Sequence, residues 1–321
     1  MQVSIDFFVN VRCFTYNHSL YIRDCLDGFC MQQTSFPYVC AVVDDASNDG
    51  EQEIIKSYLQ EHFILSDESI SKEEETNDYQ LIFAQHKTNP NCYFAVYFLK
   101  YNHYSIKKPK LPYLQAWNSI KYCAICEGDD FWISPHKLQR QVDFLLSHPN
   151  HTLCFHAHYS LFREGIKKTH NTYKRDVEIC PIKDLILGGG GVMATNSMLY
   201  IGALGNDYRV WAKSSDVGDG PLMLTLAARG LVGYINEIMS CYRVAIDGSW
   251  SQRVLRDKKK NKEHYKRTLK SWREFDEWTN YKFHHYVKRK IRKNILHYWL
   301  KRYSVIKYCI SKFKKLKNKW N

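Results

Sequence analysis

The chain has 321 residues, of which 45% are hydrophobic and 25% are charged, with a formal net charge of +13. This balance is ordinary for a globular protein large enough to bury a sizeable core, so it excludes wholesale disorder, collagen-like repeats and small disulfide scaffolds. No stretch approaches the roughly 18 uncharged apolar residues of a membrane-spanning helix, and the first residues lack a signal-peptide pattern. We therefore expect a cytoplasmic protein. Its 11 cysteines are then expected to be mostly buried free thiols.

The first part of the chain alternates between strand and helix patterns. Apolar, β-prone runs predict strands at residues 3–11 and 38–43, and helical spacing of apolar residues predicts helices at residues 19–32 and 51–63. Continuous apolar strands separated by helices indicate a parallel α/β sheet covered on both faces. Ligands bind such sheets beyond the carboxyl ends of the strands, so the turns after these strands are the first candidates for a site.

The middle of the chain continues this pattern with shorter elements. In chain order we predict an exposed acidic loop at residues 66–78, a strand at 81–84, a helix at 114–120, a strand at 122–126 and a helix at 137–146. Strands at residues 153–159 and 192–201 and a helix at 219–230 follow. The whole pattern predicts an α/β fold.

The end of the chain differs in charge from the rest. Residues 253–321 contain 24 Lys and Arg against 5 Asp and Glu, whereas residues 1–252 are mildly acidic. An apolar stripe at helical spacing, which includes Ile291, Ile295 and Trp299, predicts a basic amphipathic helix. Such a helix lies on an anionic membrane surface, or packs its stripe on the body of the protein. We expect no nucleic acid partner, because the acidic body lacks a motif that reads DNA or RNA.

Two acidic clusters each follow a short apolar strand. Asp44 and Asp45 come after the strand at 38–43, and Glu127, Asp129 and Asp130 come after the strand at 122–126. Because the carboxyl ends of parallel strands meet at one edge of a sheet, we expect the clusters to converge. Carboxylate oxygens suit Mn²⁺ or Mg²⁺, which proteins commonly bind together with substrate phosphates. The alternative is that both clusters are simply solvated turns.

Four segments together resemble a known family. They are VSIDFFVNVRCFTYNHSLYIRDCLDGF, VDDASNDG, AICEGDDFWISPHKLQRQVDFL and SSDVGDGPLMLTLAARGLVGYINEIMSCYRV. They resemble the family 2 glycosyltransferases of the GT-A fold, in the form found in bacterial enzymes that build surface polysaccharides. The resemblance implies a mixed sheet flanked by helices. It also implies a glycosyltransferase domain at residues 1–252, with a nucleotide-sugar half at about 1–135 and an acceptor half at 136–252, followed by a basic helical extension at 253–321.

The resemblance also implies roles for single residues. The nucleotide-sugar donor is expected to contact Thr15, Asn17, Asp44, Asp45, Glu127, Asp129 and Asp130. Asp129 matches the acid that binds the metal at the donor diphosphate, and Asp219 matches the catalytic base. Ala245 departs from the pattern, because many relatives carry a histidine there.

Four further residues are weaker candidates. Trp132 either stacks on a sugar or fills the core. Gly190, in a run of four glycines, either lets backbone approach a substrate or belongs to a flexible loop. Thr195 offers a hydroxyl group to a ligand, and Trp250 lies in a segment that we expect to close over the diphosphate.

These observations predict an inverting, metal-dependent glycosyltransferase for cell-surface polysaccharide synthesis. It would move a sugar from a nucleotide diphosphate to a hydroxyl group of a glycan or lipid-linked acceptor, from a cytoplasmic position peripheral to the membrane. The alternative, which the departure at Ala245 favours, is a catalytically inactive nucleotide- or carbohydrate-binding protein.

Overall fold

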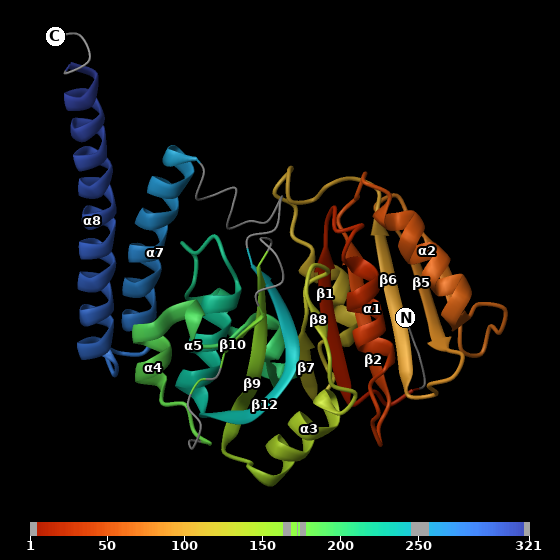
Figure 1. The fold of residues 1–321 in the computed structure, drawn as a ribbon. Coiled ribbons are helices and arrows are strands. Elements are labelled where there is room, and N and C mark those ends of the chain that lie inside the picture. The colour runs from red at the N-terminus through yellow and green to blue at the C-terminus, as the bar shows by residue number, and fades with distance from the viewer. Residues whose placement is uncertain (1–4, 163–167, 172, 174–177, 245–256, 318–321) are drawn as a thin grey trace.

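The computed structural model of the chain describes residues 5–162, 168–171, 173, 178–244 and 257–317. Its centre is a twelve-stranded mixed sheet flanked by helices (Figure 1), which confirms the predicted fold class. The main path through the sheet runs β3-β5-β6-β2-β1-β7-β11-β9-β12-β8, with β4 paired to β5 and β10 paired to β9.

The four central strands of the first half are parallel. They are β6 (Cys92–Leu99), β2 (Tyr38–Asp44), β1 (Val9–Thr15) and β7 (Tyr122–Ile125). Every residue of β2 is buried, because alternate side chains enter hydrophobic clusters on the two faces of the sheet. The connecting helices α1 (Ile22–Cys30) and α2 (Glu51–His62) lie where the sequence predicts them.

The first half of the sheet differs from the sequence-based predictions in its edge strands and in the start of β1. The acidic segment predicted as a loop contains β4 (Lys72–Glu75), which pairs antiparallel with β5 (Tyr79–His86). A strand of charged residues is stable at this position because it is an edge, where the side chains stay in solvent. The first strand also begins later than predicted, at Val9, and β3 (Phe63–Ile64) is an additional short strand beside β5.

The second half continues the same sheet. After β8 (Phe131–Trp132), which ends the first half, come α3 (Lys137–Ser147), β9 (His151–Phe162), β10 (Lys168–Asn171), α4 (Ile182–Gly188), β11 (Leu199–Ile201), α5 (Asp219–Arg229) and β12 (Leu231–Val244). β11 is antiparallel to both β7 and β9, so it joins the two halves. The strand predicted at residues 192–201 is therefore only β11, preceded by the 3-10 turn η3 (Thr195–Ser197), and the helix predicted at 114–120 is the 3-10 helix η1 (Leu111–Trp117).

The basic extension is helical, as predicted. It forms α7 (Lys258–Trp278) and α8 (His284–Lys317), and α8 rises beyond the rest of the molecule (Figure 1). Trp272, Phe275 and Val287 are buried in the same hydrophobic cluster as side chains of α4 and α5, so the base of the hairpin belongs to the core of the second half. Within the described chain, we find no helix with the length and apolar character needed to cross a bilayer. The domain boundary at residue 252 stays a prediction.

Candidate functional site

The two acidic clusters meet at the carboxyl edge of the central strands. Thr15, the last residue of β1, is level with Asp44, the last residue of β2. The acidic turn after β7 packs directly on β1, because the Gly128 amide donates to the carbonyl oxygen of Phe14 at 3.2 Å. A Cβ atom on Gly128 would lie 2.1 Å from Oγ1 of Thr15, so only glycine permits this approach.

Glu51 fixes the turns after β1 and β2 to each other. One oxygen of its fully buried carboxylate accepts a hydrogen bond from the hydroxyl of Thr15. The other accepts from the backbone amide of His18 at 2.9 Å and from the hydroxyl of Ser47 at 2.8 Å. Thr15 is 2% exposed and donates to this acid, so it positions the turn rather than offering its side chain to solvent.

Asn17 lies at the exposed rim of the same turn. Its φ of 57° is left-handed, a conformation that asparagine tolerates better than most residues. Its side-chain amide donates to Asn48 at 3.0 Å and accepts from the Asn48 backbone at 2.9 Å. This reciprocal pair holds the loops after β1 and β2 together, and the predicted nucleoside contact of Asn17 stays a prediction.

Asp44 carries a buried oxygen without a hydrogen-bond donor among the described residues. Its Oδ1 accepts from the backbone amide of Ser47 at 3.1 Å and from the side chain of Gln52, whereas its Oδ2 has no partner there. Burial raises the pKa of Asp44 to about 6, although the hydrogen bonds oppose the shift. A buried carboxylate oxygen at a sheet edge is suited to accept a hydrogen bond from a ligand.

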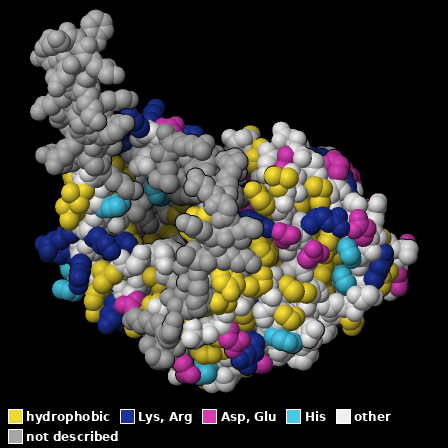
Figure 2. Space-filling view, viewed as in Figure 1, with side chains coloured by type: hydrophobic (Ala, Val, Ile, Leu, Met, Phe, Trp, Pro, Cys, Tyr) yellow, Lys and Arg dark blue, Asp and Glu magenta, His cyan; other side chains and the backbone are white. Residues whose placement is uncertain are grey.

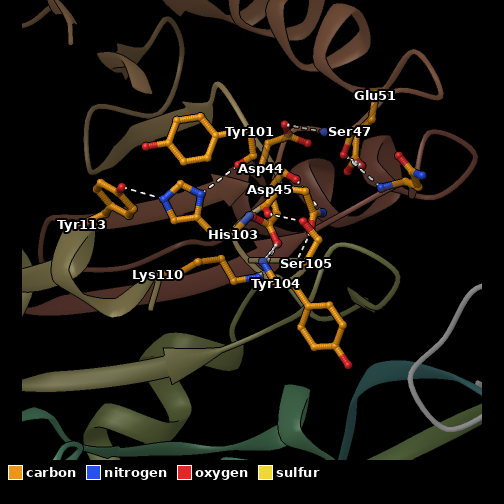
Figure 3. Close-up of polar contacts among 12 residues, drawn as sticks. Asp44, Asp45, Ser47, Glu51, Tyr101, His103, Tyr104, Ser105, Lys110 and Tyr113 are labelled. Atoms are coloured by element: carbon orange, nitrogen blue, oxygen red, sulfur yellow. Dashed lines mark hydrogen bonds and ion pairs between the residues drawn. The ribbon is translucent and has the colours of Figure 1, made fainter. Parts of the chain in front are cut away.

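Asp45, by contrast, is occupied by the chain itself (Figure 3). Its Oδ1 accepts from the backbone amide of His103 at 2.7 Å, and its Oδ2 accepts from the amide of Tyr104 at 3.2 Å and lies 3.0 Å from Nζ of Lys110. The carboxylate is only 1% exposed. Asp45 therefore anchors the segment that follows β6, and its implied nucleoside contact stays a prediction.

This anchored segment is well ordered by its own contacts. The buried ring of His103 lies 2.8 Å from the carbonyl oxygen of Tyr101 and 2.8 Å from the hydroxyl of Tyr113, as Figure 3 shows. The side chain of Tyr104 points away from this cluster and is 60% exposed. The segment thus presents an exposed aromatic side chain beside the carboxylate of Asp45 that anchors it.

Arg243, near the end of β12, holds the acidic turn from the other side. Its backbone amide donates to Oδ1 of Asp130 at 2.8 Å, and its guanidinium donates to the carbonyl oxygen of Asp129 at 2.7 Å and to the carboxylate of Asp24. Burial and the charge of Asp129 raise the pKa of Asp130 well above its usual range. Asp130 is 1% exposed and joins the acidic turn to β12, and its predicted donor contact stays a prediction.

Glu127 and Asp129 remain open to a ligand, and Asp219 lies within electrostatic reach of them. The side chain of Glu127 reaches the surface, but neighbouring protein atoms limit its hydration. This desolvation, together with the negative charges of Asp129 and Asp219, raises the pKa of Glu127 to about 8. The positive charge of Lys110 opposes the shift. Nε2 of His18 lies 3.9 Å from Oδ2 of Asp129. Asp219 is exposed in the first turn of α5. Asp129 and Asp219 therefore both lie near Glu127, and their roles as metal ligand and catalytic base stay predictions.

The chemistry of these side chains fits a divalent cation shared with a ligand. Within the described ranges, no group of three His, Cys, Asp or Glu side chains is arranged to hold a metal alone. Glu127 and Asp129 nevertheless provide exposed or half-buried carboxylates whose mutual repulsion a cation would relieve. Magnesium-like ions are typically bound by one or two carboxylates together with phosphate oxygens.

The weaker candidates divide between core and surface. Trp132 is 1% exposed, packs edge-on against Phe29 and donates to the carbonyl oxygen of Asn196 at 2.9 Å, so it fills the core and does not stack on a sugar. Gly190 is exposed in the 3-10 turn η2 (Gly189–Gly191), with open space where a Cβ would lie. Thr195 is half-buried in η3. Trp250 and Ala245 lie outside the described residues.

Four residues of the site escape sequence reasoning, and three of them give no signal along the chain. Glu51 lies in a helix where a solvated glutamate is the ordinary expectation, and His103 and Lys110 lie in a segment without a regular pattern. Arg243 gave the clearest available signal, because an arginine interrupts the apolar run at the end of β12. Its contacts with the acidic turn join residues that lie at least 113 positions apart in the sequence, so spacing along the chain does not reveal them.

Comparisons with known proteins identify relatives by sequence and by fold. Residues 13–77 match the model of glycosyl transferase family 2. An uncharacterized protein of Mycobacterium tuberculosis, Rv1520, is 28% identical over 245 residues, which cover 75% of this chain and 60% of that protein. The chain thus spans 60% of the length of this curated relative.

Among solved structures, S. aureus TarS residues 1–349 in complex with UDP is similar with a TM-score of 0.50 and 13% identity. The match covers 83% of this chain and 64% of that one. The mannosyltransferase PcManGT from Pyrobaculum calidifontis, in complex with GDP-Man and Mn²⁺, has a TM-score of 0.49 and 11% identity, over 90% of this chain and 73% of that one. At such identity the likeness to TarS shows a common fold.

Proposed function

Because the chain belongs to the family 2 glycosyltransferases with the GT-A fold, we propose that it transfers a sugar from a nucleotide-diphosphate donor to a hydroxyl group of a glycan or lipid-linked acceptor. The observation that carries the proposal is the buried Oδ2 of Asp44, which lacks a donor among the described residues and lies beside the acidic turn. A nucleobase N–H would satisfy this oxygen. The UDP complex of TarS supports a nucleoside diphosphate as the ligand class.

The donor diphosphate and a divalent cation would occupy the space at Glu127 and Asp129. These two carboxylates would hold Mn²⁺ or Mg²⁺, and the ion supplies positive charge that stabilises the departing diphosphate. Cation binding favours the ionised form of Glu127, whose raised pKa leaves it partly protonated near neutral pH in the free protein. Metal binding is therefore coupled to proton release from this site.

Asp219 would act as the catalytic base. It is exposed in the first turn of α5. The acceptor hydroxyl oxygen attacks the anomeric carbon as the bond from that carbon to the phosphate oxygen breaks, and the hydroxyl proton passes to Asp219. A single displacement of this kind inverts the anomeric configuration and releases the nucleoside diphosphate.

The acceptor is proposed from the resemblance to bacterial enzymes of surface polysaccharide synthesis. A glycan or lipid-linked acceptor of this kind is met at a membrane, which supports a cytoplasmic enzyme that is peripheral to the bilayer. The exposure of Asp219 supports its role toward a large acceptor.

The test is a binding panel followed by an activity assay. Calorimetry would measure binding of UDP, GDP, CDP and dTDP with Mn²⁺, Mg²⁺ or EDTA to wild type, Asp129→Ala and Asp219→Asn, with Glu68→Gln on an exposed segment as the control. We expect one nucleotide to bind with a metal requirement that Asp129→Ala abolishes. Asp219→Asn should bind the nucleotide but lose hydrolysis of the matching nucleotide sugar.

Two results would redirect the proposal. If no nucleotide binds wild type, a nucleotide-sugar transferase is excluded. If a nucleotide sugar binds but is neither hydrolysed nor transferred by wild type, the inactive binding protein becomes the better description.

A further inference from the structure

The apolar stripe predicted on the last helix, α8, mostly packs against the rest of the protein. Ile291 packs against the core of the second half, and Tyr298 stacks on Tyr265 of α7 at a ring distance of 3.9 Å. The predicted apolar stripe therefore largely faces inward and holds the hairpin to the body. Trp299 is the exception, because 63% of it is exposed.

A second set of side chains lies on the opposite side of the helix. Leu296, Trp299 and Leu300 are 59%, 63% and 57% exposed. Successive helix residues are rotated by about 100°, so positions 296, 299 and 300 fall within an arc of roughly 100°. Three large apolar side chains in such an arc form a continuous exposed patch, which a solvated helix does not need.

Cations continue this same face toward the start of the helix. Arg289, Arg292 and Lys293 are exposed and fall within about 60° of Leu296 when projected down the helix axis. No Asp or Glu occurs anywhere in residues 278–321. We name these six residues the α8 outer face. In Figure 2, Lys and Arg side chains gather at the end of the molecule where α7 and α8 lie, with hydrophobic surface beside them.

We propose that the α8 outer face is a docking surface for an anionic lipid bilayer. Leucine and tryptophan side chains insert at the boundary between headgroups and acyl chains, and cations beside them attract anionic headgroups. Pairing of this face with the same face of a second copy is a poorer alternative, because two acid-free segments would repel each other. The inference extends the proposed function by placing the enzyme where a lipid-linked acceptor resides, but it does not require that function.

The test is flotation with vesicles of phosphatidylcholine, with and without phosphatidylglycerol. Wild type should bind only the anionic vesicles, and added salt should weaken the binding. The triple variant Arg289→Gln, Arg292→Gln, Lys293→Gln should bind about a hundredfold more weakly, because each cation near an anionic surface contributes about fivefold. The triple variant Leu296→Ser, Trp299→Ser, Leu300→Ser should bind at least tenfold more weakly.

Matched controls separate this face from general charge and hydrophobicity. Lys258→Gln, Lys259→Gln, Lys260→Gln removes the same charge from exposed positions of α7, and Leu146→Ser removes a side chain that is 50% exposed on α3. Both should retain vesicle binding, and all variants should keep the wild-type thermal midpoint because the replaced side chains are exposed.

Several outcomes would overturn the proposal. Equal vesicle binding by all variants would do so, as would binding of the face to RNA in preference to anionic vesicles. A dimer in light scattering that only the apolar triple variant abolishes would assign the face to a second copy. The vesicle assay contains no nucleotide, so Asp219→Asn should float like wild type, and a failure of the proposed enzymatic function would leave this result unchanged.

Discussion

Replacing Asp44 with asparagine should change stability and nucleotide binding in opposite directions. Burial raises the pKa of this carboxyl group from 3.8 to about 6, so the folded state disfavours its ionised form. A shift of about two pH units corresponds to roughly 3 kcal/mol. Because the folded pKa lies above the unfolded one, the favourable contribution is complete below pH 3.8 and is lost as the pH rises through 6. Asparagine does not titrate and avoids this loss.

The pH dependence isolates this effect from the other consequences of the substitution. The introduced asparagine would keep an oxygen for Ser47 and Gln52 but would place an amide where Oδ2 now lies, and an unpaired buried amide costs about 1–3 kcal/mol. That cost is the same at all pH values. The stability of Asp44→Asn relative to wild type should therefore rise by roughly 3 kcal/mol between pH 4 and pH 8.

Urea unfolding of both proteins across this pH range measures the effect, and nucleotide calorimetry at pH 8 supplies the second readout. The amide cannot accept a hydrogen bond as the carboxylate oxygen does, so we expect nucleotide affinity to fall by about tenfold or more. A relative stability that does not change with pH would refute the stated burial cost. Unchanged affinity would refute the assignment of Oδ2 as a ligand contact.

Three other substitutions test separate parts of the structure. Burial lowers the pKa of Lys137 from 10.5 to about 7. Between these pH values the unfolded chain binds one more proton than the folded chain, so the free energy of unfolding should rise with pH. Lys137→Met should flatten this rise in urea unfolding at about pH 7 to 10. Gly128→Ala should destabilise the protein by about 1–3 kcal/mol and reduce turnover, because its Cβ would meet Thr15, and unchanged melting would contradict the close packing. Asp45→Asn should destabilise the folded protein by roughly 3 kcal/mol, because Lys110 loses its buried ionic partner. Limited proteolysis should then cut the segment after β6 faster than in wild type. Cleavage at the wild-type rate would count against the role of Asp45 as an anchor.

Local patterns predict the central elements of the fold well. The strand β2 and the helix α2 lie almost where apolar runs and helical spacing place them, because both patterns arise from residues that bury one continuous surface. The strand β4 could not be predicted in this way, since its charged residues are stable as a strand only through pairing with β5. The same limit applies to β12, whose long run is broken by polar residues that pairing with β9 accommodates.

The sequence also predicts which acidic clusters meet, but not how the acids divide their roles. Asp44 and Asp45 are neighbours of the same type, yet one keeps an oxygen without a donor among the described residues and the other binds the segment after β6. Asp129 and Asp130 differ similarly, because the backbone amide of Arg243 reaches only the second carboxylate. These differences arise from distant parts of the chain, which spacing along the sequence does not encode.

The continuous sheet limits how relatives of this protein could exchange parts. A recombination point near residue 135 would separate β7 from β11 and β8 from β12, although these strands pair across it. The indole of Trp132 and the backbone amide of Arg243 bind across the same boundary. A chimera that joins the first half of one relative to the second half of another must therefore preserve strand register and two buried hydrogen bonds. We expect evolution to change specificity here by substitutions in the loops at the carboxyl edge of the sheet.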